Sequence, residues 1–154
     1  MRKRWPGKLI VKGLVRPDDV SRAINAGADA VTVSNHGGNK LDRMQSAIDS
    51  LAWVRRAVSD QITLFFDGGI RRGSDIVVAI ALGATHCFVG RATLYGVTAG
   101  GHKGAKRAVD ILQQELSYTM AMIGCKRVAD IGGWCLADQT PHPPAIPAPR
   151  APSA

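Results

Sequence analysis

The sequence is poor in cysteine, in aromatic residues and in long apolar runs, and each shortage excludes a class of protein. The three cysteines, Cys87, Cys125 and Cys135, form no CxxC pair, so neither a disulfide framework nor a zinc or other metal site is predicted. No apolar run approaches the roughly 20 residues that a membrane helix needs. The basic residues 2–4 are followed by Trp-Pro-Gly rather than by an apolar signal core. We therefore expect a cytoplasmic protein without membrane insertion.

Acidic residues are also scarce: 12 stand against 20 lysines and arginines, which gives a net charge of +8. Such a charge can mark a nucleic-acid surface. The basic residues are dispersed, however, and only three tryptophans, three phenylalanines and two tyrosines could stack on bases. We interpret the charge as solvated surface plus a few cations for an anionic ligand, and we predict no nucleic-acid partner.

The chain alternates short apolar runs with amphipathic segments. Strands are predicted at residues 9–13, 28–34, 62–66 and 87–89, and helices at 17–26, 47–58, 74–82 and 105–123. The last helix follows a short segment through Tyr95 and a glycine-rich link at residues 100–104. Four strand-helix units in strict alternation are typical of an α/β fold with a parallel sheet.

An internal repeat sharpens this prediction. A shift of 56 positions aligns residues 9–34 with residues 65–90 without a gap. The identical pairs are Gly13 and Gly69, Arg16 and Arg72, Asp19 and Asp75, Ala23 and Ala79, Ile24 and Ile80, Gly27 and Gly83, Ala28 and Ala84, and Val33 and Val89. About 28 residues per unit is the spacing of a (β/α)8 TIM barrel of roughly 250 residues. We expect residues 1–138 to form half of such a barrel and the proline-rich residues 139–154 to be a disordered tail.

Polar loops follow the predicted strands, at the edge where parallel barrels carry their active sites. Glycine and arginine occur together in the loops at residues 67–73 and 90–91. Such glycines are often plain turn residues, but the combination in two consecutive loops favours a phosphate site. No GxGxxG is present, so a Rossmann nucleotide site is not indicated.

His36 and Lys12 are the candidate chemical groups of the first two loops. A histidine in a loop is usually an ordinary surface residue, but His36 follows a predicted strand and precedes two glycines, which suits an acid-base role. Lys12 ends the neighbouring strand, where it either meets an anion or reaches to water.

Five motifs occur here in the order seen in the FMN-dependent α-hydroxy acid dehydrogenases and oxidases, which act on lactate, glycolate or mandelate. They are Leu-Ile-Val-Lys-Gly, Ser-Asn-His-Gly-Gly, Asp-Gly-Gly-Ile-Arg-Arg-Gly-Ser-Asp, Ala-Leu-Gly-Ala and Val-Gly-Arg-Ala-Thr-Leu-Tyr-Gly. The chain resembles this family over about residues 4–125. The resemblance implies strands five to eight of the family barrel.

The resemblance also implies a role for each matching residue. His36 is implied as the catalytic base that removes a proton from a 2-hydroxy acid while two electrons pass to FMN. The implied FMN contacts are Lys12, Ser34, Asp67, Gly68, Gly69, Ile70, Arg71, Gly90 and Arg91. Asn39 and His36 are the residues implied to bind the substrate.

Two departures from the family pattern bear on function. Asn39 stands where the family usually has an arginine that binds the substrate carboxylate through two hydrogen bonds. An asparagine here is similar to the flavoenzyme that matures the mycofactocin peptide, so a modified peptide is an alternative substrate. The amino-terminal half of the family barrel is absent from this sequence. We therefore expect homo-oligomerisation or a complementary half-barrel chain, and the alternative is a non-catalytic remnant.

Overall fold

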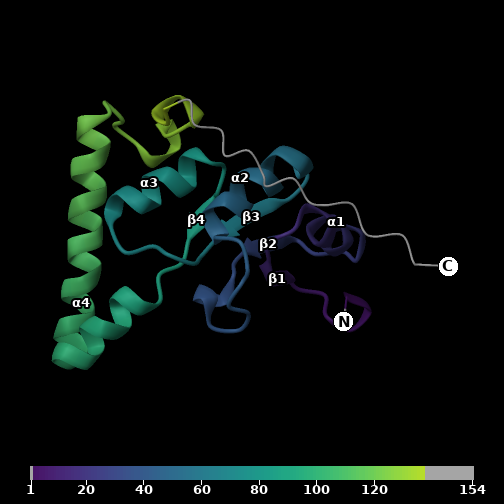
Figure 1. The fold of residues 1–154 in the computed structure, drawn as a ribbon, viewed down its shortest axis with the longest axis horizontal. Helices are drawn as coiled ribbons and strands as arrows, with labels where there is room; N and C mark the ends of the chain where they lie inside the picture. The colour runs from purple at the N-terminus through teal and green to yellow at the C-terminus, as the bar shows by residue number, and fades with distance from the viewer. Residues whose placement is uncertain (1, 138–154) are drawn as a thin grey trace.

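The computed structural model describes residues 2–137, which form an α/β fold around one parallel sheet (Figure 1). The sheet order is β1-β2-β3-β4, and all neighbouring strands run parallel. The strands are β1 (Ile10–Leu14), β2 (Ala30–Val33), β3 (Thr63–Phe66) and β4 (His86–Cys87). The main helices are α1 (Pro17–Asn25), α2 (Ala47–Val58), α3 (Gly73–Ala81) and α4 (Arg91–Met122), and 3-10 turns lie at Arg2–Arg4, His36–Gly38, Val128–Asp130 and Gly133–Cys135. The predicted alternation of strands and helices is confirmed.

Local sequence explains where the helices begin. Pro17 opens α1 with two acidic residues in its first turn, where their charge favours the positive end of the helix. The hydroxyl of Ser46 accepts a hydrogen bond from the backbone N–H of Asp49 and caps α2 at its predicted boundary. At α3 the carboxylate of Asp75 accepts the backbone N–H groups of Arg71 and Arg72 at 2.8 and 2.9 Å. Asp75, in the first turn of the helix, thus caps its amino end through its side chain, and Ser74 lies inside the helix.

The prediction of a glycine-rich link before the last helix was wrong in extent. Helix α4 begins at Arg91, and only Gly100 and Gly101 leave helical geometry. A Cβ at Gly104 would overlap the carbonyl oxygen of Gly96. The absence of side chains at Gly96 and Gly104 therefore lets the helical segments on either side of the break touch through their backbones (Figure 1).

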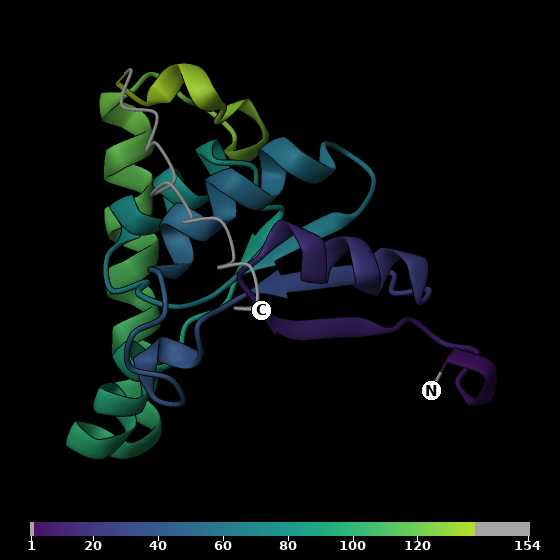
Figure 2. The ribbon, with the colours of Figure 1, turned by 45° about the vertical axis from the view of Figure 1, so that its right-hand side comes forward.

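The core lies between the sheet and helices α1, α2 and α3, which cover the same side of it (Figure 2). Two cross-strand pairs, Val31 with Leu64 and Val33 with Phe66, belong to this core. The side chains of all four residues are at most 1% exposed. Burying each such side chain contributes about 1.5–3 kcal/mol. No helix among residues 2–137 covers the other side of the sheet in Figure 2.

The observed register corrects the internal repeat by one residue in its first strand. Ile10 pairs with Ala30, and Phe65 pairs with His86. Since the repeat equates Ala30 with His86, the structural equivalent of Ile10 is Phe65, 55 rather than 56 positions away. The gap-free alignment missed this because β1 is irregular between Lys12 and Leu14.

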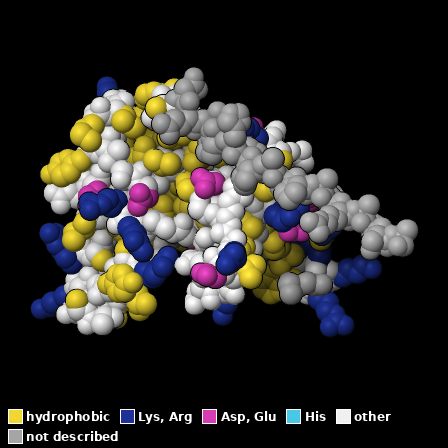
Figure 3. All heavy atoms as spheres, in the orientation of Figure 1, with side chains coloured by type: hydrophobic (Ala, Val, Ile, Leu, Met, Phe, Trp, Pro, Cys, Tyr) yellow, Lys and Arg dark blue, Asp and Glu magenta, His cyan; other side chains and the backbone are white. Residues whose placement is uncertain are grey.

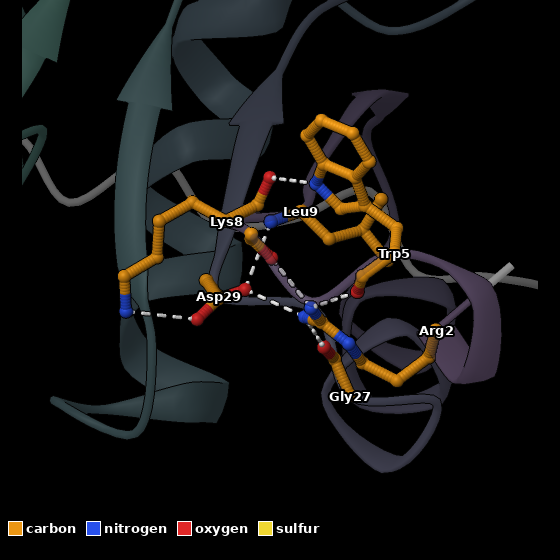
Figure 4. A network of polar contacts seen from close by, with 7 residues as sticks. Arg2, Trp5, Lys8, Leu9, Gly27 and Asp29 are labelled. Carbon is orange, nitrogen blue, oxygen red and sulfur yellow. Dashed lines mark hydrogen bonds and ion pairs between the residues drawn. The ribbon is translucent and has the colours of Figure 1, made fainter.

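A polar network holds the segment that enters β1 (Figure 4). The Asp29 carboxylate accepts the Leu9 backbone N–H at 2.8 Å and pairs with Lys8 and Arg2 at 3.0 and 2.8 Å. These contacts, the Leu9 hydrogen bond foremost, lower the pKa of Asp29 from 3.8 to about 2. Arg2 also donates to the Gly27 carbonyl, so the network ties the chain start to the end of α1.

The predicted tail at residues 139–154 lies outside the described residues. Within residues 2–137, no helix combines the length and the apolar composition needed to cross a bilayer.

Candidate functional site

The carboxyl ends of the four strands surround a cavity of about 630 Å³, a volume within the usual range for small-molecule sites. Its lining residues are Lys12, residues 36–40, residues 67–71 and residues 88–91. The loops singled out by the sequence therefore meet in one place. Ser34 does not line the cavity, but its hydroxyl contacts three residues that do, Lys12, His36 and Asp67.

The Ser34 hydroxyl is the centre of the polar network beneath the cavity. Its side chain is fully buried. It donates a hydrogen bond to the Asp67 carboxylate and accepts one from Lys12 Nζ at 2.9 Å and one from the His36 backbone N–H at 3.1 Å. Lys12 also forms an ion pair with Asp67. Lys12 fits both interpretations, because its ammonium pairs with a carboxylate of its own chain while the side chain stays 48% exposed.

The loop after β2 presents His36 in an uncommon backbone conformation, with φ of 55°. The imidazole packs on Gly13 of β1, where a Cβ would overlap His36 Cε1. Asn35 holds the loop, since its side-chain oxygen accepts the Gly37 N–H at 3.0 Å. Within residues 2–137 the imidazole nitrogens of His36 make no hydrogen bond to protein. They are therefore available to a ligand in the cavity.

A second corner of the cavity suits an anion. Gly69 and Gly90 face open space, where a Cβ would meet no atom within 4 Å. Gly90 is the N-cap of α4, whose first turn carries no acidic residue. Arg71 and Arg91 line the same corner, and neither guanidinium forms an ion pair within the described part of the chain.

The amino end of α3 is closed to a ligand. Asp75 occupies the N–H groups of Arg71 and Arg72, and the Gly73 N–H donates to Glu115 of α4 at 2.9 Å. The groups that can bind an anion in the cavity are therefore the backbone N–H groups at the start of α4 and the side chains of Arg71 and Arg91.

The other predicted site residues differ in how they reach the cavity. Asn39 lines it from an exposed position. The Ile70 side chain is 5% exposed and belongs to the core, so Ile70 serves the cavity mainly through its backbone. Sequence reasoning missed Asn35 as a loop support and Phe88 as a lining residue. An asparagine two residues before glycine is a common turn signal and could have revealed Asn35.

The model of the family described as FMN-dependent dehydrogenase matches residues 1–138. This chain belongs to that family. The family consists of FMN-dependent oxidoreductases, so the resemblance inferred from the five motifs is confirmed.

Relatives named for different activities are about equally similar to this chain. The chain is 44% identical over 131 residues to the pre-mycofactocin synthase of Mycolicibacterium smegmatis, covering 85% of this chain and 33% of that protein. It is 44% identical over 126 residues to the L-lactate oxidase of a Nostoc species, covering 82% of this chain and 34% of that one. The chain thus spans about a third of the length of these relatives.

Solved structures show the same fold. A soluble mutant of the membrane-associated (S)-mandelate dehydrogenase of Pseudomonas putida matches with a TM-score of 0.84 and 41% identity. The match covers 90% of this chain and 39% of that one. The parallel α/β architecture is therefore that of the family barrel.

Proposed function

We propose that this chain is the carboxyl-terminal half of an FMN-dependent α-hydroxy acid dehydrogenase barrel, which oxidises an α-hydroxy acid to the 2-oxo acid once the barrel is complete. Residues 1–138 are the half barrel in this proposal, with strands five to eight, and the compartment is the cytoplasm. One observation carries the proposal. His36 and the Lys12–Ser34–Asp67 network lie around one cavity at the strand ends, together with Arg71 and Arg91, which form no ion pair among residues 2–137.

The residues around the cavity fit FMN. An anionic phosphate matches the amino end of α4, the Arg71 and Arg91 guanidinium groups and the open space beside Gly69 and Gly90. Lys12 supplies a cation on the opposite side, fixed by Ser34 and Asp67. FMN, when bound, would supply the two-electron acceptor of the oxidation.

The chain's own groups would handle the proton and hold the ligands. His36 would accept the substrate proton at an imidazole nitrogen, since both nitrogens lack a protein hydrogen bond among residues 2–137. Asn35 and the Ser34 hydroxyl hold the backbone on both sides of His36 and so orient its ring. Lys12 would stabilise negative charge that develops beside it.

Asn39 supports a second candidate, a flavoenzyme that oxidises a modified peptide. A neutral amide lacks the charge to bind a carboxylate as a bidentate arginine does. The 44% identity to pre-mycofactocin synthase is as high as that to L-lactate oxidase, so identity does not separate the candidates. A third possibility is a non-catalytic remnant that keeps the fold.

A flavin spectrum of the purified chain tests the proposal first. We expect bound FMN after reconstitution, bleaching by lactate or mandelate without oxygen, and loss of bleaching in His36→Ala with flavin retained. The control His102→Ala changes a histidine outside the cavity. Absence of bound flavin at high protein concentration would contradict the enzymatic proposal for the chain alone and favour the remnant.

Asn39→Arg separates the two substrate classes. If a carboxylate pocket is present, the new guanidinium should lower the concentration of hydroxy acid needed for half-maximal bleaching by roughly 10-fold or more, since a charged hydrogen bond contributes about 1.5–3 kcal/mol. The matched control is Asn39→Gln, which keeps the amide. If Asn39→Arg and Asn39→Gln need the same hydroxy acid concentration for half-maximal bleaching, the peptide substrate is favoured.

A further inference from the structure

The sheet ends in two edges that each expose a large apolar side chain. Ile10 on edge strand β1 and Phe88, directly after edge strand β4, are both 49% exposed. Phe88 packs edge-on against Phe65, with ring centroids 5.7 Å apart, and Phe65 packs likewise against His86 at 5.4 Å. Exposed apolar edges of this kind promote association with another strand.

The internal repeat indicates which strand each free edge strand can pair with. Units β1-α1-β2 and β3-α3-β4 are equivalent, and the chain contains one junction between them, where β2 pairs with β3. At the free edges, β4 is the equivalent of β2, and β1 is the equivalent of β3. We infer that two copies of this chain close head to tail into an eight-stranded barrel, in which β4 of each copy pairs with β1 of the other.

The observed β2–β3 register determines the register of this interface. Thr32 pairs with Phe65. In the repeat, Thr32 corresponds to Phe88, 56 positions later, and Phe65 corresponds to Ile10, 55 positions earlier. Phe88 of one copy therefore lies beside Ile10 of the second copy, and the same contact recurs at the other junction. The interface buries both half-exposed side chains.

Backbone groups agree with this register. The Phe88 N–H donates to the Phe66 carbonyl at 2.8 Å, so alternation along the strand turns the groups of Val89 toward the free edge. The Leu9 carbonyl accepts the Asp29 N–H, which leaves the Lys12 N–H on the free side of β1. At the existing junction the Asp67 N–H donates to the Val33 carbonyl at 3.1 Å. The equivalent bond joins the Lys12 N–H of one copy to the Val89 carbonyl of the other.

The low burial of helix α4 is an independent indication that another subunit packs against it. Its equivalent, α2, lies over the β2–β3 junction and buries six of its twelve residues. Helix α4 has 32 residues, of which Leu112 alone is buried. Val109, Ile111 and Met122 are exposed apolar residues along it, and hydrophobic side chains reach the surface over α4 in Figure 3. The second copy supplies the β1 and α1 surface that α4 lacks.

The size of the fold also favours a second copy. Four strands are half of the eight that close a parallel barrel. The inference does not depend on flavin, because every contact that carries it lies in the strands and α4.

Light scattering during size-exclusion chromatography tests the assembly. We expect wild type at twice the 16.3 kDa chain mass. Phe88→Asp and Ile10→Lys should each reduce the mass to one chain, with unchanged far-ultraviolet circular dichroism, because both side chains are half exposed in one copy. Val128→Asp, which charges an exposed apolar residue away from both edges, is the matched control and should remain dimeric.

The double variant Ile10→Lys/Phe88→Asp tests the register itself. It places opposite charges beside each other at both junctions, so it should recover the two-chain mass that each single change loses. A monomeric wild type would overturn the inference and assign the edges to a different chain. A dimer that survives Phe88→Asp, a double variant that stays monomeric or an open-ended polymer would also overturn it.

Discussion

Ser34 is polar and yet fully buried, and three groups of the candidate site meet at its hydroxyl. A hydroxyl can donate one hydrogen bond and accept two, and Ser34 uses all three. Lys12, Asp67 and the His36 backbone are therefore positioned by one oxygen atom. The arrangement explains how a cation and a candidate base stay at a fixed separation.

Replacing Ser34 by alanine should destabilise the protein by about 1–3 kcal/mol, because the fully buried hydroxyl makes three hydrogen bonds and two of them are to charged groups. Urea unfolding followed by circular dichroism would measure the loss. Ser21→Ala, a change on the exposed face of α1, is the control and should have little effect. Equal stability of the two variants would show that the Ser34 network contributes nothing to folding.

Asp29 should make stability depend on acid pH. Its pKa is lowered to about 2 in the folded chain, so its contribution is complete above the unfolded value of 3.8 and is lost as pH falls toward 2. Wild type should therefore lose stability between about pH 4 and pH 2 more steeply than Asp29→Asn.

Chemical unfolding across this pH range would measure the difference. Asp18→Asn is the control, because that carboxylate is exposed and makes one long contact to Arg16 at 3.5 Å. A parallel fall in wild type and Asp29→Asn would contradict the role assigned to the network in Figure 4.

Among the secondary-structure elements, α4 depends on glycine in two different ways. Gly101, with φ of 54°, allows the break, whereas Gly96 and Gly104 allow the helical segments to approach closely. The approach leaves no room for a side chain. The tertiary contact, rather than helix propensity, therefore explains the glycine content of this segment.

Gly104→Ala should destabilise the chain by about 1–3 kcal/mol, the usual cost of overpacking, because its methyl group would overlap the Gly96 carbonyl. Thermal unfolding would detect the change as a lower midpoint. Gly100→Ala is the matched control, since a Cβ there meets nothing within 4 Å. If both variants unfold at the same temperature, the close approach is unimportant.

For the whole molecule, ligand binding should couple to stability through the phosphate corner. FMN at a hundredfold excess over its dissociation constant should stabilise the fold by about 2.7 kcal/mol. Riboflavin, which lacks the phosphate, should stabilise it much less. Arg91→Ala should weaken FMN binding roughly 10- to 100-fold and leave riboflavin unaffected.

Thermal shift measurements with both ligands would test this coupling. Arg107→Ala removes an exposed arginine of α4 that does not line the cavity and serves as the control. Equal loss of FMN and riboflavin binding in Arg91→Ala would contradict a phosphate contact and indicate a general loss of structure.

Much of the fold could be predicted because it depends on local patterns. Apolar runs located the four strands, the apolar stripe of residues 47–58 located α2, and the motifs located the loops that form the cavity. Three features escaped prediction because they depend on contacts distant in the chain. They are the one-residue correction in β1, the early start of α4 and the role of Ser34 as a shared hydrogen-bond partner.

The sequence by itself determined the family, the strand-helix alternation and the residues that follow each strand, since periodicity and motif order are properties of neighbouring residues. Only the tertiary structure decided which groups meet. It paired Lys12 with Asp67, 55 positions away, and closed the amino end of α3 with Glu115 of α4. The first pairing arises because parallel strands bring their carboxyl ends to one edge, and the second because α3 packs against α4. No local pattern specifies the distances in either.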